Sequence, residues 1–130
     1  MHKSIFSLFI LILFLVSCNK EQDPFQISKQ NIGLLTDSTQ VKDLEMIFSK
    51  DSIVKFISGD EFTGNINDIE IFEKGGIKLL TITPRQSLDS TSVIESVQVF
   101  DSRFKTDKNI TTLSTFKDIA DNYKISRIDN

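Results

Sequence analysis

Cysteine and histidine, which often act as nucleophiles, general bases or metal ligands, each occur once in this 130-residue chain. Cys18 and His2 both lie near the N-terminus. Ser-His-Asp and Cys-His catalysis are therefore not expected in the rest of the chain, and neither are zinc, haem or iron–sulfur sites. The phosphate-binding motifs GxxxxGK[ST] and GxGxxG do not occur. We predict no catalytic residue, no metal ligand and no cofactor.

One serine and one lysine have the spacing of a nucleophile and its base. Ser114-Thr115-Phe116-Lys117 fits S-x-x-K, but the S-D-N and K-T-G motifs that accompany this pattern are absent. Such a lysine must also be desolvated, and Lys117 is expected beside the apolar face of a helix rather than on it. Ser114 or its neighbour is better suited to cap that helix. A Ser-Lys hydrolase therefore stays only an alternative.

Acidic side chains are the next candidates for chemistry. A pair of carboxylates could serve a hydrolase, and several together with backbone carbonyls could bind calcium. No D-x-[DN]-x-[DN]-G loop is present, and Asp68 and Glu70 alternate with Ile69 and Ile71, as on a strand with one solvated face. We interpret the acidic residues as surface groups and keep a carboxylate-dependent hydrolase as an alternative. The residues considered are Asp51, Asp60, Glu61, Asp68 and Glu70.

Phenylalanine supplies most of the aromatic side chains, with 11 Phe, one Tyr and no Trp. Most are expected in the core, because a chain with one cysteine has no internal disulfide and depends on packing. Phe62 and Phe104 are exceptions, since both stand among turn-forming and charged residues. An exposed aromatic residue there would mark a partner site. We predict that Phe62 and Phe104 contact a protein partner in the cell envelope.

Residues 1–17 have the pattern of a secretory signal. Lys3 precedes an apolar run from Ile5 to Val16 that only Ser7 interrupts. This run of 12 residues is shorter than the roughly 20 that a membrane-spanning helix needs. We predict a signal helix that is cleaved, rather than a transmembrane anchor.

The residues at the end of the signal indicate how the chain is attached. Leu15-Val16-Ser17-Cys18 resembles the lipobox of bacterial lipoproteins. The resemblance implies cleavage before Cys18, a diacylglycerol thioether on its sulfur, and a fatty acid such as palmitate on the new amino group. Several acyl chains hold a protein on a bilayer almost permanently. We therefore expect a lipoprotein that is anchored in a membrane of the cell envelope through Cys18.

Residues 18–24 are predicted to be the lipidated cysteine and a short polar tether. A tether of this length reaches about 20 Å, so the domain over 25–130 is expected near the membrane. Asn19 is similar to the outer-membrane sorting residue of lipoproteins, and Lys20-Glu21-Gln22-Asp23 is loosely similar to the acidic export signals of Bacteroidota surface lipoproteins. These resemblances imply the outer membrane and leave its periplasmic and surface faces open.

The charge balance excludes one class of partner. Removal of residues 1–17 takes away Lys3 and leaves 14 basic and 18 acidic residues, a net charge of −4. No cluster of Lys or Arg interrupts this acidic character. We therefore expect no nucleic acid partner.

Hydrophobic spacing predicts a helix followed by strands. The helix is expected over 39–49, with its N-cap in the Thr36–Thr39 cluster. Gly75-Gly76 is expected to form a hairpin turn. Strands are expected over 53–57, 68–71, 77–82 and 93–100, with a polar loop over 85–91. Phe25-Gln26-Ile27 also alternates, which favours a short strand there.

A second amphipathic segment, 109–123, partly repeats 31–48. Both contain Asn-Ile followed by Lys-Asp and a similar run of apolar positions, although the second is three residues shorter between the two dipeptides. Either duplication or chance produces such a pattern. Residues 125–128 resemble the start of a strand, so truncation of the domain at its C-terminal end is also considered.

Together these elements predict an α+β fold. The expected architecture is a single small domain with a mainly antiparallel sheet of about five strands and two amphipathic helices packed on one face. The predicted core consists of Leu35, Val41, Leu44, Phe48, Val54, Phe56, Ile69, Ile71, Leu79, Ile82, Val97, Val99, Ile119 and Tyr123.

The lipobox, Gly33-Leu34-Leu35-Thr36 and the stretch 104–116 before a helix ending at Tyr123 are similar to small Bacteroidota envelope lipoproteins of unknown function. The similarity implies a fold type and an address, and it carries over no functional residue. We predict a non-enzymatic binding or scaffolding module. The alternatives are an inhibitor or sensor that presents a loop, 85–91 or 58–66, and the two hydrolases.

Overall fold

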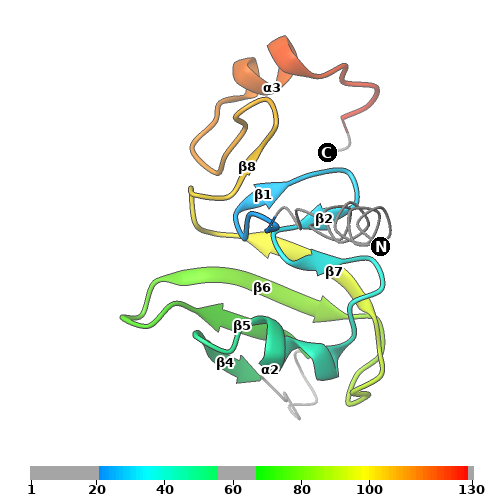
Figure 1. Cartoon of the computed structure of the whole chain (residues 1–130). Coiled ribbons are helices and arrows are strands. Elements are labelled where there is room, and N and C mark those ends of the chain that lie inside the picture. Colours follow the sequence, from blue (N-terminus) through cyan, green and yellow to red (C-terminus); the bar gives the residue numbers. More distant parts are fainter. Residues whose placement is uncertain (1–20, 56–66, 129–130) are drawn as a thin grey trace, which may run out of the picture.

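The computed structural model describes residues 21–55 and 67–128, which form a small mixed α+β fold with two sheets (Figure 1). The short-stranded sheet has the order β3-β2-β1-β8, and the long-stranded sheet has the order β4-β5-β6-β7. The short strands are β1 Gln26–Ile27, β2 Asn31–Ile32, β3 Leu35–Thr36 and β8 Lys105–Thr106. The long strands are β4 Ser52–Lys55, β5 Ile69–Phe72, β6 Lys78–Pro84 and β7 Ile94–Val99. The predicted signal helix lies outside the described residues.

The long-stranded sheet is an antiparallel meander with β5 and β6 at its centre. Buried Ile69 and Ile71 alternate with half-buried residues along β5, so one face of this strand belongs to the core. Gly75 and Gly76 have φ angles of +112° and +93° in the turn between β5 and β6. Glycine adopts such angles without strain. The predicted hairpin is confirmed.

The short-stranded sheet depends on one glycine in a tight turn. Gly33 lies between β2 and β3 with φ of +57°. A Cβ atom at this position would lie 2.1 Å from the carbonyl oxygen of Pro24, which is far inside van der Waals contact. Both the backbone angle and the space therefore require glycine. Beyond this turn, β1 pairs in parallel with β8, which arrives from the far end of the described chain.

A single apolar cluster connects the two sheets. Six of its buried members were predicted from the sequence, and Leu80 and Phe104 join them. Val41, Phe48, Val97 and Val99 are half-buried against the cluster. The buried set is Leu35, Leu44, Ile69, Ile71, Leu79, Leu80, Ile82 and Phe104.

Three predicted core residues lie elsewhere. Val54, Ile119 and Tyr123 are exposed, so their assignment to the core is wrong. Val54 lies on β4, an edge strand whose outer face has no covering layer among the described residues. Ile119 belongs to the C-terminal helix and Tyr123 is its C-cap residue, and this helix does not cover a sheet face. Phe56 lies outside the described residues.

The helix predicted over 39–49 is shorter than expected. A 3₁₀ helix η1 covers Val41–Asp43 and an α-helix α2 covers Leu44–Ile47. Gln40 is the N-cap residue rather than a residue of the Thr36–Thr39 cluster. Leu44 is fully buried, so this short segment packs against the long-stranded sheet (Figure 1).

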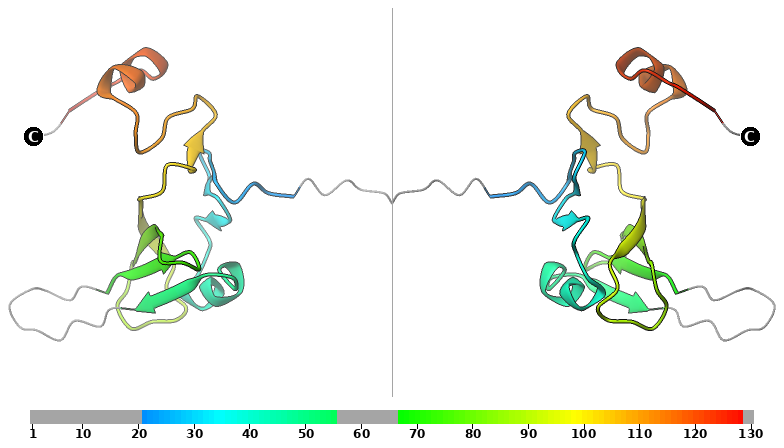
Figure 2. Two further views of the ribbon diagram at one scale, coloured as in Figure 1. Left: turned by 90° about the vertical axis from the view of Figure 1, so that its left-hand side faces the viewer. Right: turned by 90° about the vertical axis from the view of Figure 1, so that its right-hand side faces the viewer.

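The second helix lies at the opposite end of the molecule from α2 (Figure 1). The α3 helix spans Phe116–Asn122, and all of its residues are exposed. Figure 2 shows it projecting beyond β8. The prediction of two helices packed on one sheet face is therefore wrong for α3.

Among the described residues, no helix is long and apolar enough to cross a bilayer.

The predicted single sheet of about five strands is replaced by two four-stranded sheets. The α+β class and the mainly antiparallel pairing are confirmed, apart from the parallel β1–β8 pair. Strands of two residues, such as β1 and β8, complete only one alternation. The short strand favoured by the alternation at 25–27 corresponds to β1, but the period of two was not recognised in β2, β3 or β8, and for this reason the sequence did not predict the second sheet.

Replacement of Phe104 by Ala is expected to destabilise the fold by about 3–5 kcal/mol, because it removes a large buried ring and leaves a cavity. Urea unfolding measures this loss. Phe116→Ala is the matched control, because Phe116 is 61% exposed whereas Phe104 is 2% exposed. The control is expected to change the free energy of unfolding by no more than about 0.5 kcal/mol. Equal losses for the two variants would contradict the assignment of Phe104 to the core.

Candidate functional site

Of the two predicted partner contacts, Phe62 and Phe104, only Phe104 lies in the part of the chain that the structure describes. Cys18 and Phe62 lie outside the described residues, as do Asp60 and Glu61. Phe104 is only 2% exposed, so the expectation that it lies at the surface is wrong. Its ring packs edge-to-face on Phe25, with 5.0 Å between the ring centroids. The charged neighbours of Phe104 in the sequence point outward, whereas its own side chain fills the core between the sheets.

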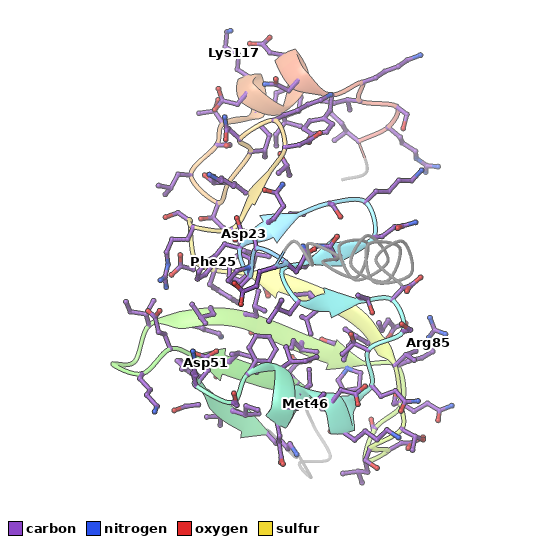
Figure 3. The ribbon with its side chains drawn as sticks, viewed as in Figure 1. Asp23, Phe25, Met46, Asp51, Arg85 and Lys117 are labelled. Carbon is purple, nitrogen blue, oxygen red and sulfur yellow. The ribbon has the colours of Figure 1, made fainter. Side chains whose placement is uncertain are left out.

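The Ser-Lys pattern does not assemble a nucleophile and a base. The hydroxyl of Ser114 accepts a hydrogen bond from the backbone of Thr111 over 2.9 Å. Lys117 forms a surface ion pair with Asp121, with 2.8 Å between Nζ and Oδ2, and Figure 3 shows it pointing away from the body. Thr115, the neighbour of Ser114, is the N-cap of α3, as one of the two predicted capping residues.

The three predicted carboxylates that the structure describes, Asp51, Asp68 and Glu70, do not share a partner. Asp68 accepts a hydrogen bond from the Thr83 hydroxyl over 2.6 Å, and Glu70 pairs with Lys78 over 2.5 Å. Burial, followed by the nearby Glu73, raises the pKa of Asp51. No group of three or more metal-ligating side chains occurs in the part of the chain that the structure describes.

The strongest polar cluster joins the two sheets through Arg103. Its guanidinium donates to both carboxylate oxygens of Glu73 over 3.0 Å, and to both carboxylate oxygens of Asp101 over 3.0 Å. It also lies over the ring of Phe25, 4.6 Å from the centroid. Figure 3 shows Phe25 beside Asp23, between the two sheets. The guanidinium and the two carboxylates form their hydrogen bonds with one another. We therefore interpret this cluster as a structural junction rather than a ligand site.

The hydrogen bonds from Arg103 lower the pKa of Asp101. A lowered pKa means that the ionised carboxylate stabilises the folded state. This stabilisation is complete above the unfolded pKa of about 4 and is lost as the pH falls through the folded value. The raised pKa of Asp51 has the opposite sign, because its ionisation becomes less favourable on folding.

Six of the twelve large hydrophobic residues that are exposed in the described part of the chain lie within residues 113–128, which we call the C-terminal arm. Leu113 is 79% exposed and Phe116 is 61% exposed. The exposed apolar residues of the arm are Leu113, Phe116, Ile119, Tyr123, Ile125 and Ile128. Several neighbouring apolar side chains left in water are typical of a surface that another molecule covers.

The arm is fastened by its own neighbours in the sequence. The Tyr123 hydroxyl donates to the Thr106 hydroxyl over 2.9 Å. Lys108 donates to the carbonyl oxygen of Asn122 over 2.5 Å and lies over the Tyr123 ring, 4.4 Å from its centroid. These contacts fix Tyr123 and leave the apolar side of α3 uncovered. The sequence could not reveal this, because helical spacing of apolar residues looks the same on a covered and an uncovered helix.

A second surface feature is the loop over 85–91, which the sequence predicted as polar. Leu88 lies in it with φ of +59° and is 76% exposed, so a strained backbone presents an apolar side chain. Asp89 accepts from the backbone and hydroxyl of Thr91 over 2.9 and 2.7 Å. Ser90 accepts from the backbone of Lys42 over 2.8 Å, which ties the loop to η1.

A shallow groove of about 340 Å³ lies between the two sheets. One wall is formed by residues 94–97 of β7, and the other by the β1–β2 hairpin and by residues 35–37. Ile32, Leu35 and Val97 supply part of its apolar lining. A neighbouring hollow runs from the same hairpin to Tyr123 of the arm, and both hollows share residues 27–29.

The change Asp101→Asn is expected to flatten the acid dependence of stability. The wild-type free energy of unfolding should fall as the pH drops below about 4, because Asp101 loses the charge that Arg103 stabilises. Urea unfolding over this range measures the slope. Asp37→Asn, at an exposed position, is the control and should retain the wild-type slope. An unchanged slope in Asp101→Asn would refute a contribution from this pair.

Comparison with models of protein families, with curated proteins and with solved structures gives no match. What the protein does must therefore be inferred from its own residues. The arm, the loop over 85–91 and the groove beside β7 are the three features that could serve recognition.

Proposed function

We propose that this protein is a lipid-anchored lipoprotein of the cell envelope, most consistent with the outer membrane, and that its domain is a non-enzymatic binding or scaffolding module. The anchor is Cys18, and the partner is another protein of the envelope. The proposal combines the signal and lipobox pattern of the sequence with the surface of the described residues.

The uncovered apolar surface of the C-terminal arm is the observation that carries this proposal. Water contact with Leu113, Phe116 and Ile128 costs free energy that burial against a partner would recover, at about 25 cal/mol per Å². The capping box at Thr115 and the hydrogen bond from Tyr123 hold the arm in a defined shape. A preformed apolar surface loses less conformational entropy on binding than a flexible one.

The polar contacts of the described residues support a hydrolase less well than the exposed apolar arm supports a binding module. The serine and lysine of the S-x-x-K pattern have separate partners. Asp68 and Glu70 are each paired with a different side chain, on the same strand face. A carboxylate-dependent mechanism needs two such groups facing one bond of the substrate.

The loop over 85–91 favours a second candidate, a loop-presenting inhibitor or sensor. The specific observation is Leu88, whose side chain is exposed on a left-handed residue of a loop held by hydrogen bonds. A rigid loop with one protruding apolar side chain fits a complementary pocket of a partner. The other loop considered for this role, 58–66, lies outside the described residues.

A double change in the arm, Leu113→Ser with Phe116→Ser, tests the proposed function. The full chain is solubilised from the envelope with its lipid, and the proteins that come with it are identified by mass spectrometry. We expect a stoichiometric envelope protein to accompany the wild type and to be reduced about tenfold for the variant, a loss of about 1.4 kcal/mol of binding free energy.

Met46→Ser is the matched control for this experiment. Met46 is 76% exposed on α2, at the far end of the molecule from the arm (Figure 3). The control should retain the partner at the wild-type level, because its apolar side chain does not belong to the arm. Identical capture by the arm variant, the control and the wild type would contradict recognition through the arm. Loss in Leu88→Ser alone would favour the loop instead.

Replacement of Cys18 by Ser tests the anchor separately. The wild type should partition into a detergent phase and have an intact mass above that of the unmodified chain, because thioether and amide acylation add lipid. The Cys18→Ser variant should stay unmodified and keep its signal residues. Ser17→Ala, which retains a small residue before the cysteine, should behave as the wild type. A wild-type mass equal to the bare polypeptide would refute lipidation.

A further inference from the structure

We propose that the groove beside β7 binds an extended peptide segment of another protein, which adds as a strand to the free edge of the long-stranded sheet. This inference deepens the proposed binding function by naming the form of its ligand. It rests on the edge of β7 and on the groove lining, and uses no residue of the arm.

The pairing of β7 with β6 determines which backbone groups face the groove. Phe100 donates to the carbonyl oxygen of Leu79 over 3.0 Å, and Gln98 lies opposite Thr81 in the same register. In an antiparallel pair, residues that bond to the neighbouring strand alternate with residues that do not. Gln98 therefore bonds toward β6, and the N–H and C=O groups of Val97 and Val99 point to the other edge.

This outer edge is occupied only at its start among the described residues, where the N–H of Ile94 donates to the carbonyl oxygen of Thr39 over 3.3 Å and Val93 forms a bridge with Gln40; it is unpaired at Val97 and Val99. β7 is the last strand of its sheet, and its only strand partner among the described residues is β6. None of the backbone or side-chain hydrogen bonds found in the described part of the chain involves the outward groups of Val97 or Val99. Unpaired donors and acceptors at the spacing of a strand are complementary to the backbone of another extended chain.

The groove beside this edge has the lining that an added strand needs. Residues 94–97 line it consecutively, so the strand edge itself forms the wall. Val97 lies opposite the fully buried Ile82, and its side chain is therefore on the core side of the sheet. Ile32 and Leu35 face the same hollow. Every second side chain of an added strand would meet this apolar lining, while the intervening ones would point to the polar outer face.

The charges around the groove indicate which side chains the peptide ligand should carry. Glu95 is exposed on β7 at the register shift between β6 and β7, and Asp37 lies on the opposite wall. Lys29 is the single basic side chain in the lining. The net acidic rim favours a peptide that alternates small or β-branched apolar residues with polar or basic ones.

Selection from a random peptide library displayed on phage tests this inference. The full chain, held in mild detergent, is the target, and the displayed peptides are about seven residues long, the length of an ordinary strand. We expect enrichment of sequences with an apolar residue at every second position. Enriched peptides without this alternation, or no enrichment over the unselected library, would overturn the proposal.

Val97→Pro is the decisive variant. Proline removes the outward N–H, and it is tolerated at an edge position where that group is not bonded to the neighbouring strand. The enriched peptides should bind this variant at least about tenfold more weakly than the wild type, a change of 1.4 kcal/mol. Val97→Ala keeps the N–H and is the control, for which binding should change less. Equal binding to wild type and Val97→Pro would refute strand addition.

Amide exchange provides a readout that does not depend on the folding of a variant. In the wild-type chain, the amide protons of Val97 and Val99 should exchange rapidly with solvent and become protected when an enriched peptide is added. Protection elsewhere and not at these two amides would contradict the proposed site. Self-pairing of two copies through β7, seen as a dimer by sedimentation that peptides do not dissociate, would also contradict it. The arm variant should bind these peptides normally, so failure of the groove and failure of the arm are distinguishable.

Discussion

The contact on which the rest of the structure depends is the junction at residues 101–104, where β7 ends and the chain turns toward β8. Phe104 inserts between the sheets and packs on Phe25. Arg103, next to it, forms paired hydrogen bonds with Glu73 at the end of the β5–β6 hairpin and with Asp101. Two adjacent residues thus make different contacts. The ring of Phe104 points into the core, and the guanidinium of Arg103 forms a bidentate ion pair at the surface. Surface ion pairs alone contribute little, so the ring carries most of the stabilisation and the arginine mainly fixes its direction.

The junction also determines what the molecule displays. It places β8 beside β1, and the chain that leaves β8 continues into the C-terminal arm, away from the core. It also holds the short-stranded sheet above the edge of β7, which leaves a groove rather than a closed layer. The arm and the groove, two of the three candidate recognition surfaces, therefore follow from the way in which Arg103 and Phe104 join the sheets. Among the buried side-chain polar groups of the described residues, the Thr81 hydroxyl is the one found without a hydrogen-bond partner.

Much of the long-stranded sheet was predictable, and the reasons are local. Ile69 and Ile71 alternate with polar residues, and Gly75-Gly76 can adopt the positive φ angles of a hairpin turn without strain. The burial of Phe104 was not predictable, because its neighbours Arg103 and Lys105 suggest a surface segment. The charge of Arg103 is satisfied by Glu73, 30 residues away, which no local pattern reveals. Ile119 and Tyr123 have the spacing of core residues and yet remain exposed, since spacing shows which face is apolar but not what covers it.

Native-state hydrogen exchange of the wild-type chain tests most directly whether the junction makes the two sheets one cooperative unit. The most protected amides of β1 and β2 should then exchange with the same opening free energy as those of β5 and β6, because Phe104 and the apolar cluster belong to both sheets. The amides of α3 should open at a much lower free energy, since the arm has no covered face. If the amides of the short-stranded sheet opened separately and at lower free energy than those of β5 and β6, the junction would not have the role assigned to it.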